Sequence, residues 1–476
     1  MFSSRKALAA QASAQMSCAA PLTVAYLPTA ALRPDPRNPR THSKKQITQI
    51  ARSMRTFGFN VPLLIQEDGT VIAGHGRLLA CLQLGWTEAP TIRLAHLSPD
   101  QVRAFQITDN RLSDISTWDE RLLGEALRDL SALDLDFSLE VTGFNMGEID
   151  FRIEGLELSD PSKPDRADAV PPASPGPAVS RPGDLWVLGR HRLLCGSALE
   201  GEAYQTVMSG ERADVVFTDP PYNVPIGGHV SGLGAVQHRE FAMASGEMSI
   251  SEFTGFLTTV MHRLVENSAD GAIQFVCMDW RHMGELLLAG QAAGVELKNL
   301  CVWGKDNAGM GSLYRSQHEL VLVFKSGTAP HRNNVELGRH GRHRSNLWRY
   351  PGVNSFGRKG EEGNLLALHP TVKPVQLVAD ALLDCSSRGD VVLDPFMGSG
   401  TTLIAAERVG RCCRGVELDP LYVDTIIRRW EVFTGDQAVH ADTGQRFAEI
   451  EEERANEARS IPETDALGVE ETNNAA

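Results

Sequence analysis

The chain has 476 residues, of which 42% are hydrophobic and 22% charged, and its formal net charge is −14. This length exceeds what one ordinary hydrophobic core organises, so we expect two or three folded units. No apolar run approaches the roughly 18 residues that a membrane helix needs, and polar residues interrupt the N-terminal stretch too often for a signal peptide.

The eight cysteines form no CxxC pair. Most lie in apolar runs such as QFVCM and NLCVW, which is typical of reduced thiols in a core rather than of disulfides or a zinc site. We therefore predict a cytoplasmic protein without a metal site and without membrane association.

The first predicted elements belong to an N-terminal α+β unit, 22–155. Apolar residues at 47, 50, 54 and 57 repeat with a helical period. VPLLIQEDGTVIAG (61–74) has two short apolar runs around Glu67-Asp68-Gly69 and predicts a β-hairpin. HGRLLACLQLG (75–85) then predicts a helix that ends at Gly85.

A proline-rich segment follows this unit. Seven prolines fall in 157–183 with almost no large apolar side chains, which predicts an extended linker over 156–183. A second unit is expected over 184–450. The remaining residues, 451–476, are polar and acidic and predict a disordered tail.

In the second unit, apolar strand candidates alternate with helical stretches. The strand candidates are ADVVF, AIQFVCM, LKNLCVW, ELVLVF, DVVLDPF and CCRGVEL, and the clearest helices are LVADALLDCSS and TTLIAAERVG. This alternation predicts an α/β fold, with a mainly parallel sheet and helices on both of its faces. Such a sheet binds its ligand at the carboxyl ends of its strands.

The first of these strands runs directly into Asp219-Pro220-Pro221-Tyr222. The prolines stiffen the turn and add no N–H donors, so a carboxylate and a free carbonyl lie side by side next to an aromatic ring. Two acceptors match the two hydrogens of an exocyclic amino group, and a ring matches a flat base. Hydrogen bonds from both N–H groups would localise the nitrogen lone pair for attack. A proline-stiffened turn with a solvated Asp is the alternative.

The charge is unevenly distributed. Segment 331–360 contains seven Lys or Arg residues against one acid, whereas 441–476 contains ten acids against three arginines. A basic stretch is often only a solvated loop, so it is weak evidence for DNA by itself.

VVLDPFMGSGTT (391–402) has the pattern of a strand, a glycine turn and a helix start. Gly398 and Gly400 allow close approach of the backbone to a ligand, and Thr401 and Thr402 can cap the following helix. Glu417 ends the next strand, where an acid suits the two hydroxyls of a ribose. The pattern predicts a site for a nucleoside cofactor without naming it.

Together, TDPPYN (218–223), HPTVKP (369–374) and DPFMGSGTT (394–402) resemble the DNA amino-methyltransferases that use S-adenosyl-L-methionine. The catalytic motif precedes the cofactor loop by 175 residues, the permuted order of the β class. The resemblance covers roughly 184–450 and implies a Rossmann-like methyltransferase sheet. It also implies a target-recognition region at about 300–365, which raises the prospect that the basic segment contacts DNA.

The resemblance assigns roles by position. Asp219 and the Pro220 carbonyl would bind the target amine, with Pro221 in the turn, and Tyr222 would stack on the base. Cofactor residues would be Asp394, Phe396, Gly398, Gly400, Thr401, Glu417 and Lys373. In LWVLGRHRLLCGSA (185–198), Ser197 replaces the Asp that commonly follows the glycine, which puts one contact to the cofactor's adenine in doubt. Candidates for DNA contact are Trp303, Lys305, Tyr314, Arg315, Arg342 and Arg344.

The family also sorts substrates by the first motif residue, and Asp usually accompanies adenine. We therefore expect N6-adenine methylation of double-stranded DNA, with N4-cytosine as the alternative. By analogy, the enzyme would be an orphan without a restriction partner, and a homodimer is compatible with this interpretation.

RNPRTHS (37–43), TVIAGHGRLLACLQLG (70–85) and ITDNRLSD (107–114) resemble the ParB/sulfiredoxin-like domain of partition proteins. The resemblance implies a phosphate site at Gly74, His75, Gly76 and Arg77 for CTP or another nucleotide. Sulfiredoxin chemistry is not expected, because this turn has no Cys, and nuclease activity is not expected, because no acidic cluster suits it. A ParB-like regulatory protein with an inactive methylase half is the alternative for the whole chain.

Overall fold

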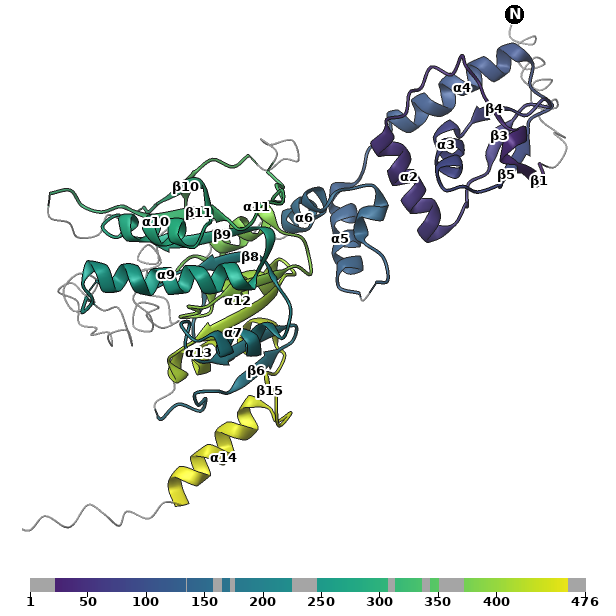
Figure 1. The fold of residues 1–476 in the computed structure, drawn as a ribbon. Helices are drawn as coiled ribbons and strands as arrows, with labels where there is room; N and C mark the ends of the chain where they lie inside the picture. Colours follow the sequence, from purple (N-terminus) through teal and green to yellow (C-terminus); the bar gives the residue numbers. More distant parts are fainter. Residues whose placement is uncertain are drawn as a thin grey trace, which may run out of the picture. The chain divides into compact units, whose positions relative to one another are not determined.

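The computed structural model describes residues 22–133, 135–156, 165–171, 176–224, 246–306, 313–335, 343–350 and 372–460. The chain divides into two compact units, Met1–Glu157 and Leu158–Ala476, called unit 1 and unit 2 (Figure 1). Within the described residues, no helix is both long and apolar enough to cross a membrane.

Unit 1 contains a five-stranded sheet in the order β1-β5-β3-β4-β2. Its strands are β1 (Val24–Pro28), β2 (Arg33–Pro34), β3 (Leu63–Ile65), β4 (Thr70–Ala73) and β5 (Glu88–Arg93). β3 and β4 pair antiparallel, so the predicted hairpin is confirmed. Gly69 in its turn has a φ of 83°, and a Cβ there would lie 2.5 Å from the Ala31 carbonyl oxygen, so only glycine fits.

The helices of unit 1 are α2 (Lys44–Phe57), α3 (His75–Gln83), α4 (Pro99–Asp114), α5 (Glu120–Ser131) and α6 (Met146–Gly155). The helices predicted before and after the hairpin are therefore confirmed as α2 and α3. Buried side chains of α2 and α3, including Met54 and Leu78, form a core with the sheet, and α5 and α6 share a separate small core.

Unit 2 is built on a ten-stranded sheet in the order β12-β10-β11-β9-β8-β13-β14-β7-β6-β15. The strands are β6 (Leu185–Leu188), β7 (His191–Cys195), β8 (Ala213–Thr218), β9 (Ser268–Met278), β10 (Glu296–Gly304), β11 (His318–Lys325), β12 (Leu347–Arg349), β13 (Val391–Asp394), β14 (Cys412–Glu417) and β15 (Val439–His440). All six predicted strands are present.

The sheet is parallel only in part. The five adjacent strands β9, β8, β13, β14 and β7 are parallel, whereas β11 runs antiparallel to both β9 and β10. β6 and β15 add antiparallel pairs at the other side. β10 and β12 pair parallel, so β11 and β6 are the strands that run against the others. The expectation of a mainly parallel sheet therefore holds, and the two reversed strands could not be predicted because apolar periodicity carries no information on strand direction.

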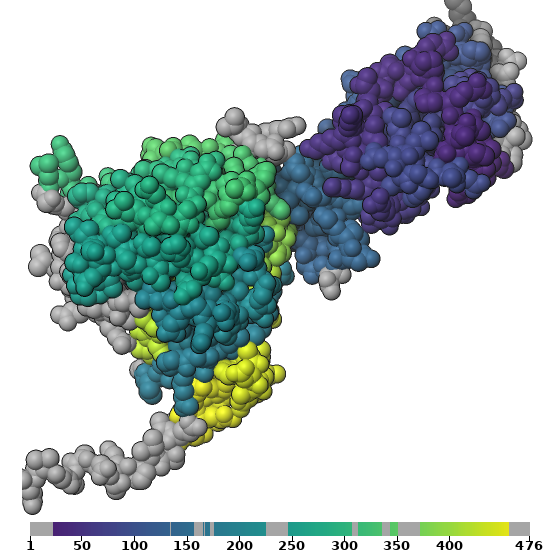
Figure 2. Space-filling view, viewed as in Figure 1, coloured from purple at the N-terminus to yellow at the C-terminus, as the bar shows by residue number. Residues whose placement is uncertain are grey.

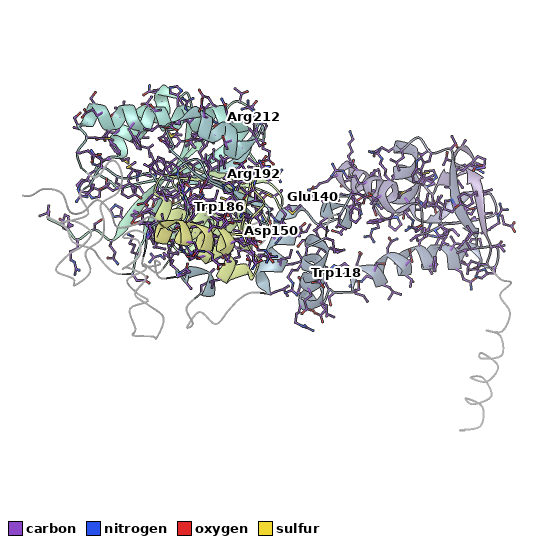
Figure 3. All side chains as sticks on the ribbon, turned by 90° about the horizontal axis from the view of Figure 1, so that it is seen from below. Trp118, Glu140, Asp150, Trp186, Arg192 and Arg212 are labelled. Carbon is purple, nitrogen blue, oxygen red and sulfur yellow. The ribbon has the colours of Figure 1, made fainter. Side chains whose placement is uncertain are left out.

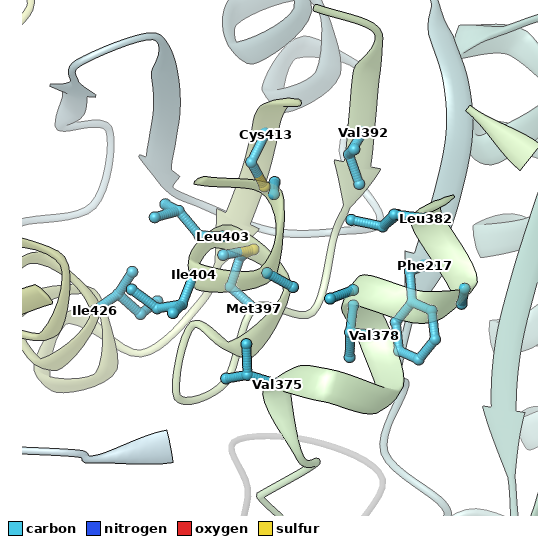
Figure 4. Close-up of a cluster of buried hydrophobic side chains, with 14 of the residues drawn as sticks. Phe217, Val375, Val378, Leu382, Val392, Met397, Leu403, Ile404, Cys413 and Ile426 are labelled. Carbon is cyan, nitrogen blue, oxygen red and sulfur yellow. The ribbon is translucent and has the colours of Figure 1, made fainter. Parts of the chain in front are cut away.

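Helices cover both faces of this sheet, as predicted. They are α7 (Gly201–Met208), α9 (Ile250–Asn267), α10 (Met283–Ala292), α11 (Val375–Cys385), α12 (Thr401–Arg408), α13 (Pro420–Thr434) and α14 (Phe447–Ser460). Along β8, Phe217 (Figure 4) and Val215 pack in the core beneath α11 and α12, and Val216 packs in the core beneath α7 and α9. In the space-filling view, the teal side chains of α9 and α10 form the outer surface on one side of unit 2 (Figure 2).

Described parts of the proline-rich segment are fixed on unit 2. The Asp424 carboxylate on α13 accepts hydrogen bonds from the backbone N–H groups of Val179 (2.7 Å) and Ser180 (2.8 Å). The Asp168 carboxylate accepts one from the N–H of Val375, at the start of α11. An extended linker was expected here. Instead, these residues form hydrogen bonds with the Asp424 carboxylate and with the N terminus of α11.

The C-terminal helix α14 is attached through Trp186 of β6, which is fully buried (Figure 3). The Trp186 ring lies 5.2 Å from the His440 ring and 5.3 Å from the Phe447 ring, centroid to centroid. α14 continues to Ser460 and so occupies the first ten residues of the predicted disordered tail; 461–476 lie outside the described residues.

Candidate active site

The motifs predicted for catalysis and for cofactor binding meet at one edge of the unit 2 sheet. β8, β13 and β14 are parallel neighbours, and they end at Thr218, Asp394 and Glu417. The Thr218 hydroxyl donates a hydrogen bond to Asp394 Oδ1 at 2.8 Å. The sheet therefore places Asp219 beside a turn that lies 175 residues further along the chain.

Asp219 is held by two donors. Lys373 Nζ lies 2.5 Å from Asp219 Oδ2, and the Tyr222 hydroxyl lies 2.5 Å from Asp219 Oδ1. Lys373, predicted to lie near the cofactor, is thus in direct contact with the predicted catalytic carboxylate. No described residue donates a hydrogen bond to the Pro220 carbonyl oxygen, so this acceptor is available for an incoming N–H group.

Asn223 closes this turn. Its φ is 53°, a left-handed conformation that Asn tolerates better than most residues. The Asn223 amide donates to the Met248 carbonyl at 2.8 Å and accepts from the N–H groups of Gly246 and Met248. Its side chain therefore fixes the position of the Asp-Pro-Pro-Tyr turn, a role that was not predicted from sequence.

Glu319, a second carboxylate that was not predicted from sequence, belongs to the same cluster. It lies at the start of β11, and because β11 is antiparallel, its first residues reach the edge where β8 ends. Glu319 Oε2 lies 3.0 Å from Lys373 Nζ and 3.4 Å from the Tyr222 hydroxyl. Its other oxygen is bonded to Lys305 Nζ. The sequence signal that could have indicated this role is the position of Glu319, an acid at the start of the apolar run ELVLVF.

The pKa values of the two carboxylates are shifted in opposite directions. Burial raises the pKa of Asp219 above its ordinary value, Lys373 opposes this, and the nearby charge of Glu319 adds to it. Burial would also raise the pKa of Glu319, but the combined attraction of Lys373 and Lys305 lowers it to about 2. The pKa of Lys373 is raised by Asp219 and Glu319 in spite of burial. Glu319 and Lys373 are therefore ionised at neutral pH.

The glycine turn after β13 is tightly constrained. Gly398 and Gly400 have φ values of 50° and 82°. A Cβ on Gly400 would lie 2.9 Å from the Ile426 side chain, so glycine is required for packing as well as for conformation. Because Gly400 precedes α12 without a side-chain cap, the first N–H groups of the helix keep room for a ligand. Thr401 is buried at that helix start.

Asp394 and Glu417 flank this turn. Asp394 Oδ1 accepts from the N–H of Phe396 at 3.0 Å, and Glu417 Oε2 accepts from the N–H of Gly398 at 2.8 Å. Burial raises the pKa of each carboxyl to about 7. Neither has a Lys, Arg or His partner within 4.0 Å in the described part of the chain. This pair suits a ligand that brings a positive charge and hydroxyl donors.

At the neighbouring strand end, the N–H of Gly196 donates to the Glu417 carbonyl at 2.9 Å. Ser197 follows, and its hydroxyl accepts from the N–H of Leu199 at 3.3 Å. The residue that replaces the family's Asp therefore lies beside Glu417 but caps its own turn.

The predicted DNA contacts are dispersed. Tyr314 is 84% exposed and Arg315 is also exposed, both shortly before β11. Trp303 is only 2% exposed and donates to the Tyr350 carbonyl, so a base contact does not fit its burial. Lys305 is paired with Glu319. Arg342 lies outside the described residues.

Arg344 is engaged within the molecule. Its guanidinium lies 3.1 Å from the Asp384 carboxylate and 3.3 Å from the Asp380 carboxylate, both on α11, and 2.6 Å from the Tyr350 hydroxyl. It therefore holds the segment 343–350 on α11 in this state. Sequence could not predict this, because the acids lie some 40 residues away.

The nucleotide site predicted in unit 1 lies at the start of α3. Gly74 has a φ of 100°, and His75 Nε2 accepts a hydrogen bond from the N–H of Asp35 at 3.2 Å. Gly76 packs against His42, and burial lowers the pKa of Arg77. The four predicted residues are contiguous, so they lie together at one helix end.

Within the described residues, no group of three or more His, Cys, Asp or Glu side chains could hold a metal ion. The seven described cysteines are unpaired, and all except half-buried Cys412 are buried.

Models of three known families match three separate parts of the chain. A DNA methylase model matches residues 213–428, a ParB N-terminal domain model matches 14–111, and a ParB-methyltransferase HTH domain model matches 121–182. The last match spans α5, α6 and most of the proline-rich segment. No DNA-binding helix-turn-helix was predicted there from sequence.

Two relatives cover different parts of the chain. The ParB-like nuclease domain-containing protein YnaK of Escherichia coli is 41% identical over 80 residues, 17% of this chain and 92% of YnaK. The type II methyltransferase M2.MboI of Moraxella bovis is 26% identical over 231 residues, 46% of this chain and 81% of M2.MboI.

Solved structures with similarity include the M1.HpyAVI–SAM complex, with 20% identity and a TM-score of 0.36 over 50% of this chain and 97% of that protein. Another is the cytosine-N4-specific PvuII DNA methyltransferase, with 16% identity and a TM-score of 0.40 over 56% of this chain and 92% of that protein. The family matches, together with the motifs, show that the chain joins a DNA methylase domain of the N6/N4 amino family to an N-terminal ParB domain.

Proposed function

We propose that unit 2 transfers a methyl group to the N6 amino group of adenine in double-stranded DNA. The observation that carries the proposal is the acidic first residue of the catalytic turn, Asp219, which precedes Pro220, a residue whose carbonyl accepts no hydrogen bond from a described residue. In the family that the chain resembles, Asp at this position usually accompanies adenine.

The residues of the turn would prepare the amine for attack. The Asp219 carboxylate and the Pro220 carbonyl would each accept one N–H of the amino group, which draws the nitrogen toward a tetrahedral shape. A base must leave the helix stack to reach this turn, at a cost of a few kcal/mol. Stacking on Tyr222, which is half-buried at the edge of the cluster, would offset part of that cost.

The glycine turn would hold the methyl donor. S-adenosylmethionine supplies a methyl group on a positively charged sulfur, and the sulfur keeps the electron pair of the broken bond. Asp394 would face the methionine amino group, and Glu417 would accept from the ribose hydroxyls. Phe396, Gly398, Gly400 and Thr401 would shape the pocket. The uncompensated carboxylates with pKa values near 7 fit a cationic ligand of this kind.

The methylated nitrogen must lose one proton. Asp219 is the group in place to accept it, because it would already be hydrogen-bonded to that nitrogen. Its raised pKa makes it a better proton acceptor than an ordinary Asp carboxylate.

The proposal is tested by methylating unmodified duplex DNA with the full-length protein and labelled S-adenosylmethionine, then separating the nucleosides. We expect N6-methyladenine, and methylation-sensitive sequencing of the same DNA should give one recognition sequence. N4-methylcytosine as the sole product would overturn the adenine assignment, and absence of any transfer would overturn the activity.

In a bacterial host, we expect the methylated sequence to persist without cleavage of unmethylated DNA, as for an orphan enzyme. Cleavage that depends on a neighbouring gene would contradict this.

We also propose that Gly74, His75, Gly76 and Arg77 of unit 1 bind the phosphates of CTP or a related nucleotide. The positive φ of Gly74 and the open start of α3 support this. Calorimetry with CTP, ATP and S-adenosylmethionine on the wild type and on Arg77→Gln tests it. Nucleotide binding that is unchanged in Arg77→Gln would contradict it.

A further inference from the structure

The donors that hold Asp219 have a second acceptor within reach. Lys373 Nζ lies 2.5 Å from Asp219 and 3.0 Å from Glu319. The Tyr222 hydroxyl lies 2.5 Å from Asp219 and 3.4 Å from Glu319. Two donors are therefore shared between two carboxylates, one of which belongs to the catalytic turn.

This sharing matters because Asp219 is a weaker hydrogen-bond acceptor for the target amino group while Lys373 neutralises its charge. A carboxylate that is already paired with an ammonium is a weaker acceptor for a neutral N–H donor. Lys373 is buried, at 6% side-chain exposure, so it cannot leave for solvent without another anion to hold it. Glu319, fixed by Lys305 on its other oxygen, is the described anion in contact with it.

We propose that Glu319 is a positioning residue that retains Lys373 and Tyr222 when Asp219 turns its oxygens to the amino group of the target base. The inference rests on the proposed methyl transfer. In the free enzyme the two donors bridge both carboxylates, and in the DNA complex they are bonded to Glu319. Nothing is consumed in this exchange, which moves hydrogen bonds and leaves every group in its protonation state.

The test compares Glu319→Gln and Glu319→Asp with the wild type in full-length protein. In Glu319→Gln, Lys373 stays on Asp219, so we expect kcat to fall by about 10²-fold with S-adenosylmethionine affinity unchanged. Because the Glu319 charge raises the pKa of Asp219, its loss should move the acid limb of the kcat/KM profile to lower pH. Glu319→Asp should recover part of kcat. Glu296→Gln, on the exposed start of the adjacent strand β10, is the matched control and should behave as wild type.

A Glu319→Gln enzyme with wild-type kcat and an unshifted pH profile would overturn this inference alone. A crystal structure of the DNA complex that keeps Lys373 on Asp219 with the base in place would do the same. A wild type that methylates no DNA would overturn the proposed function as well, so the two failures are distinguishable.

Helix α2 in unit 1 carries a row of cationic side chains. Lys44, Lys45, Arg52 and Arg55 are exposed, and their spacings of three, seven and eight residues place them on one face. None has a carboxylate within 4.0 Å among the described residues. We call these four side chains the α2 basic face.

The charges at the start of α2 are opposite to those a helix start favours. The first turn of α2 contains no acid, whereas α4, α5 and α6 begin with Asp100, Glu120 and Glu148. Since the positive end of the helix dipole repels Lys44 and Lys45, they do not serve the stability of α2. An external anion would compensate them.

We infer that the α2 basic face binds the phosphate backbone of duplex DNA and so delivers the substrate to unit 2. Eleven residues separate Lys44 from Arg55, which corresponds to about 16 Å along the helix. A duplex carries one negative charge per about 1.7 Å, so a face of this length meets several phosphates. This inference about the α2 basic face also rests on the proposed function, in which DNA is the substrate.

The test is a quadruple variant, Lys44→Gln, Lys45→Gln, Arg52→Gln and Arg55→Gln, in the full-length protein. Binding to a duplex without the recognition sequence should weaken, and the slope of log affinity against log salt should become shallower by about 3 to 4. KM for DNA should rise while kcat stays unchanged. The matched control removes four ion-paired cations of unit 2, Arg192, Arg263, Lys298 and Arg428, for the same change in net charge.

An unchanged salt slope would overturn the α2 surface while leaving methyl transfer intact. Loss of CTP binding without loss of DNA binding would also overturn it, because the face would then serve a free nucleotide. If the wild type neither methylates DNA nor binds it, both the proposed function and the α2 surface would be overturned.

Discussion

Two pairs of buried or half-buried carboxylates lie at one edge of the same sheet, and the two pairs differ in whether cationic side chains balance their charge. Asp219 and Glu319 share Lys373, and Lys305 completes the set, so two anions meet two cations. Asp394 and Glu417 have no cationic partner in the described residues, and the pKa of each is raised to about 7.

The difference indicates what each half of the site accepts. A region that contains its own counter-charges suits a neutral ligand that offers N–H donors, such as a nucleobase. A region of uncompensated carboxylates suits a ligand that brings positive charge, such as S-adenosylmethionine. Under the proposed function, the charge of each region would therefore distinguish the two substrates.

The largest expected effect comes from breaking the first region. Asp219→Ala removes the acceptor for the target amine, and we expect methyl transfer to fall by about 10²- to 10⁴-fold. Binding of S-adenosylmethionine should persist, because the second region is untouched. Transfer of labelled methyl groups and calorimetry measure the two quantities separately. Comparable transfer by Asp219→Ala and by the surface control Glu296→Gln would remove Asp219 from the mechanism.

Asp394→Asn breaks the second region instead. It removes the charge that we assign to the methionine amino group, and we expect S-adenosylmethionine to bind about 10- to 150-fold more weakly, as for a lost hydrogen bond to a charged group. Without ligand, the variant should melt at a higher temperature than the wild type at pH 8. The reason is that a carboxyl whose folded pKa is raised destabilises the fold at pH values above that pKa.

Asp442→Asn, an exposed residue near β15, is the control for this loss of charge. If Asp394→Asn bound the cofactor normally, the contrast between the two regions would have no bearing on ligand choice.

Much of this edge could be predicted from sequence, because its strands have strong apolar patterns and end in turns with distinctive residues. The Asp219 turn and the glycine loop lie where the motifs indicated. Glu319 could not be placed, since its position depends on β11 running antiparallel, and strand direction is not encoded in apolar periodicity.

The intramolecular partners of other candidate side chains could not be predicted, because these partners come from distant segments. Trp303 and Arg344 looked like candidates for DNA contact in a basic region. Trp303 is buried and its indole N–H donates to the Tyr350 carbonyl, and Arg344 is paired with two acids of α11. Only the folded chain brings these groups together.

A change of pH sharpens the comparison without any mutation. Below pH 7, Asp394 and Glu417 become protonated and lose their attraction for a cation. We expect the dissociation constant of S-adenosylmethionine to rise by about tenfold from pH 8 to pH 6, since the ionised fraction of one group with a pKa of about 7 falls by that factor. Calorimetry in buffers of different ionisation enthalpy should also detect proton release on binding. Affinity that is constant over this range would mean that neither carboxyl titrates near pH 7.

The smallest expected effect tests the bond that joins the two regions. Thr218 ends β8 and donates to Asp394 Oδ1, and this hydrogen bond lowers the pKa of Asp394 against the larger effect of burial. Thr218→Val keeps the shape and removes the donor, so the pKa of Asp394 should rise further above 7. At pH 7, S-adenosylmethionine should bind about threefold to tenfold more weakly, as expected for about 1 kcal/mol.

At pH 9, where Asp394 is ionised in both proteins, the Thr218→Val enzyme should approach wild-type affinity. Thr218→Ser keeps the hydroxyl and should bind as wild type at both pH values. A Thr218→Val defect of equal size at pH 7 and pH 9 would mean that Thr218 supports the strand end by packing alone. The charge of Asp394 would then be set by burial without help from β8.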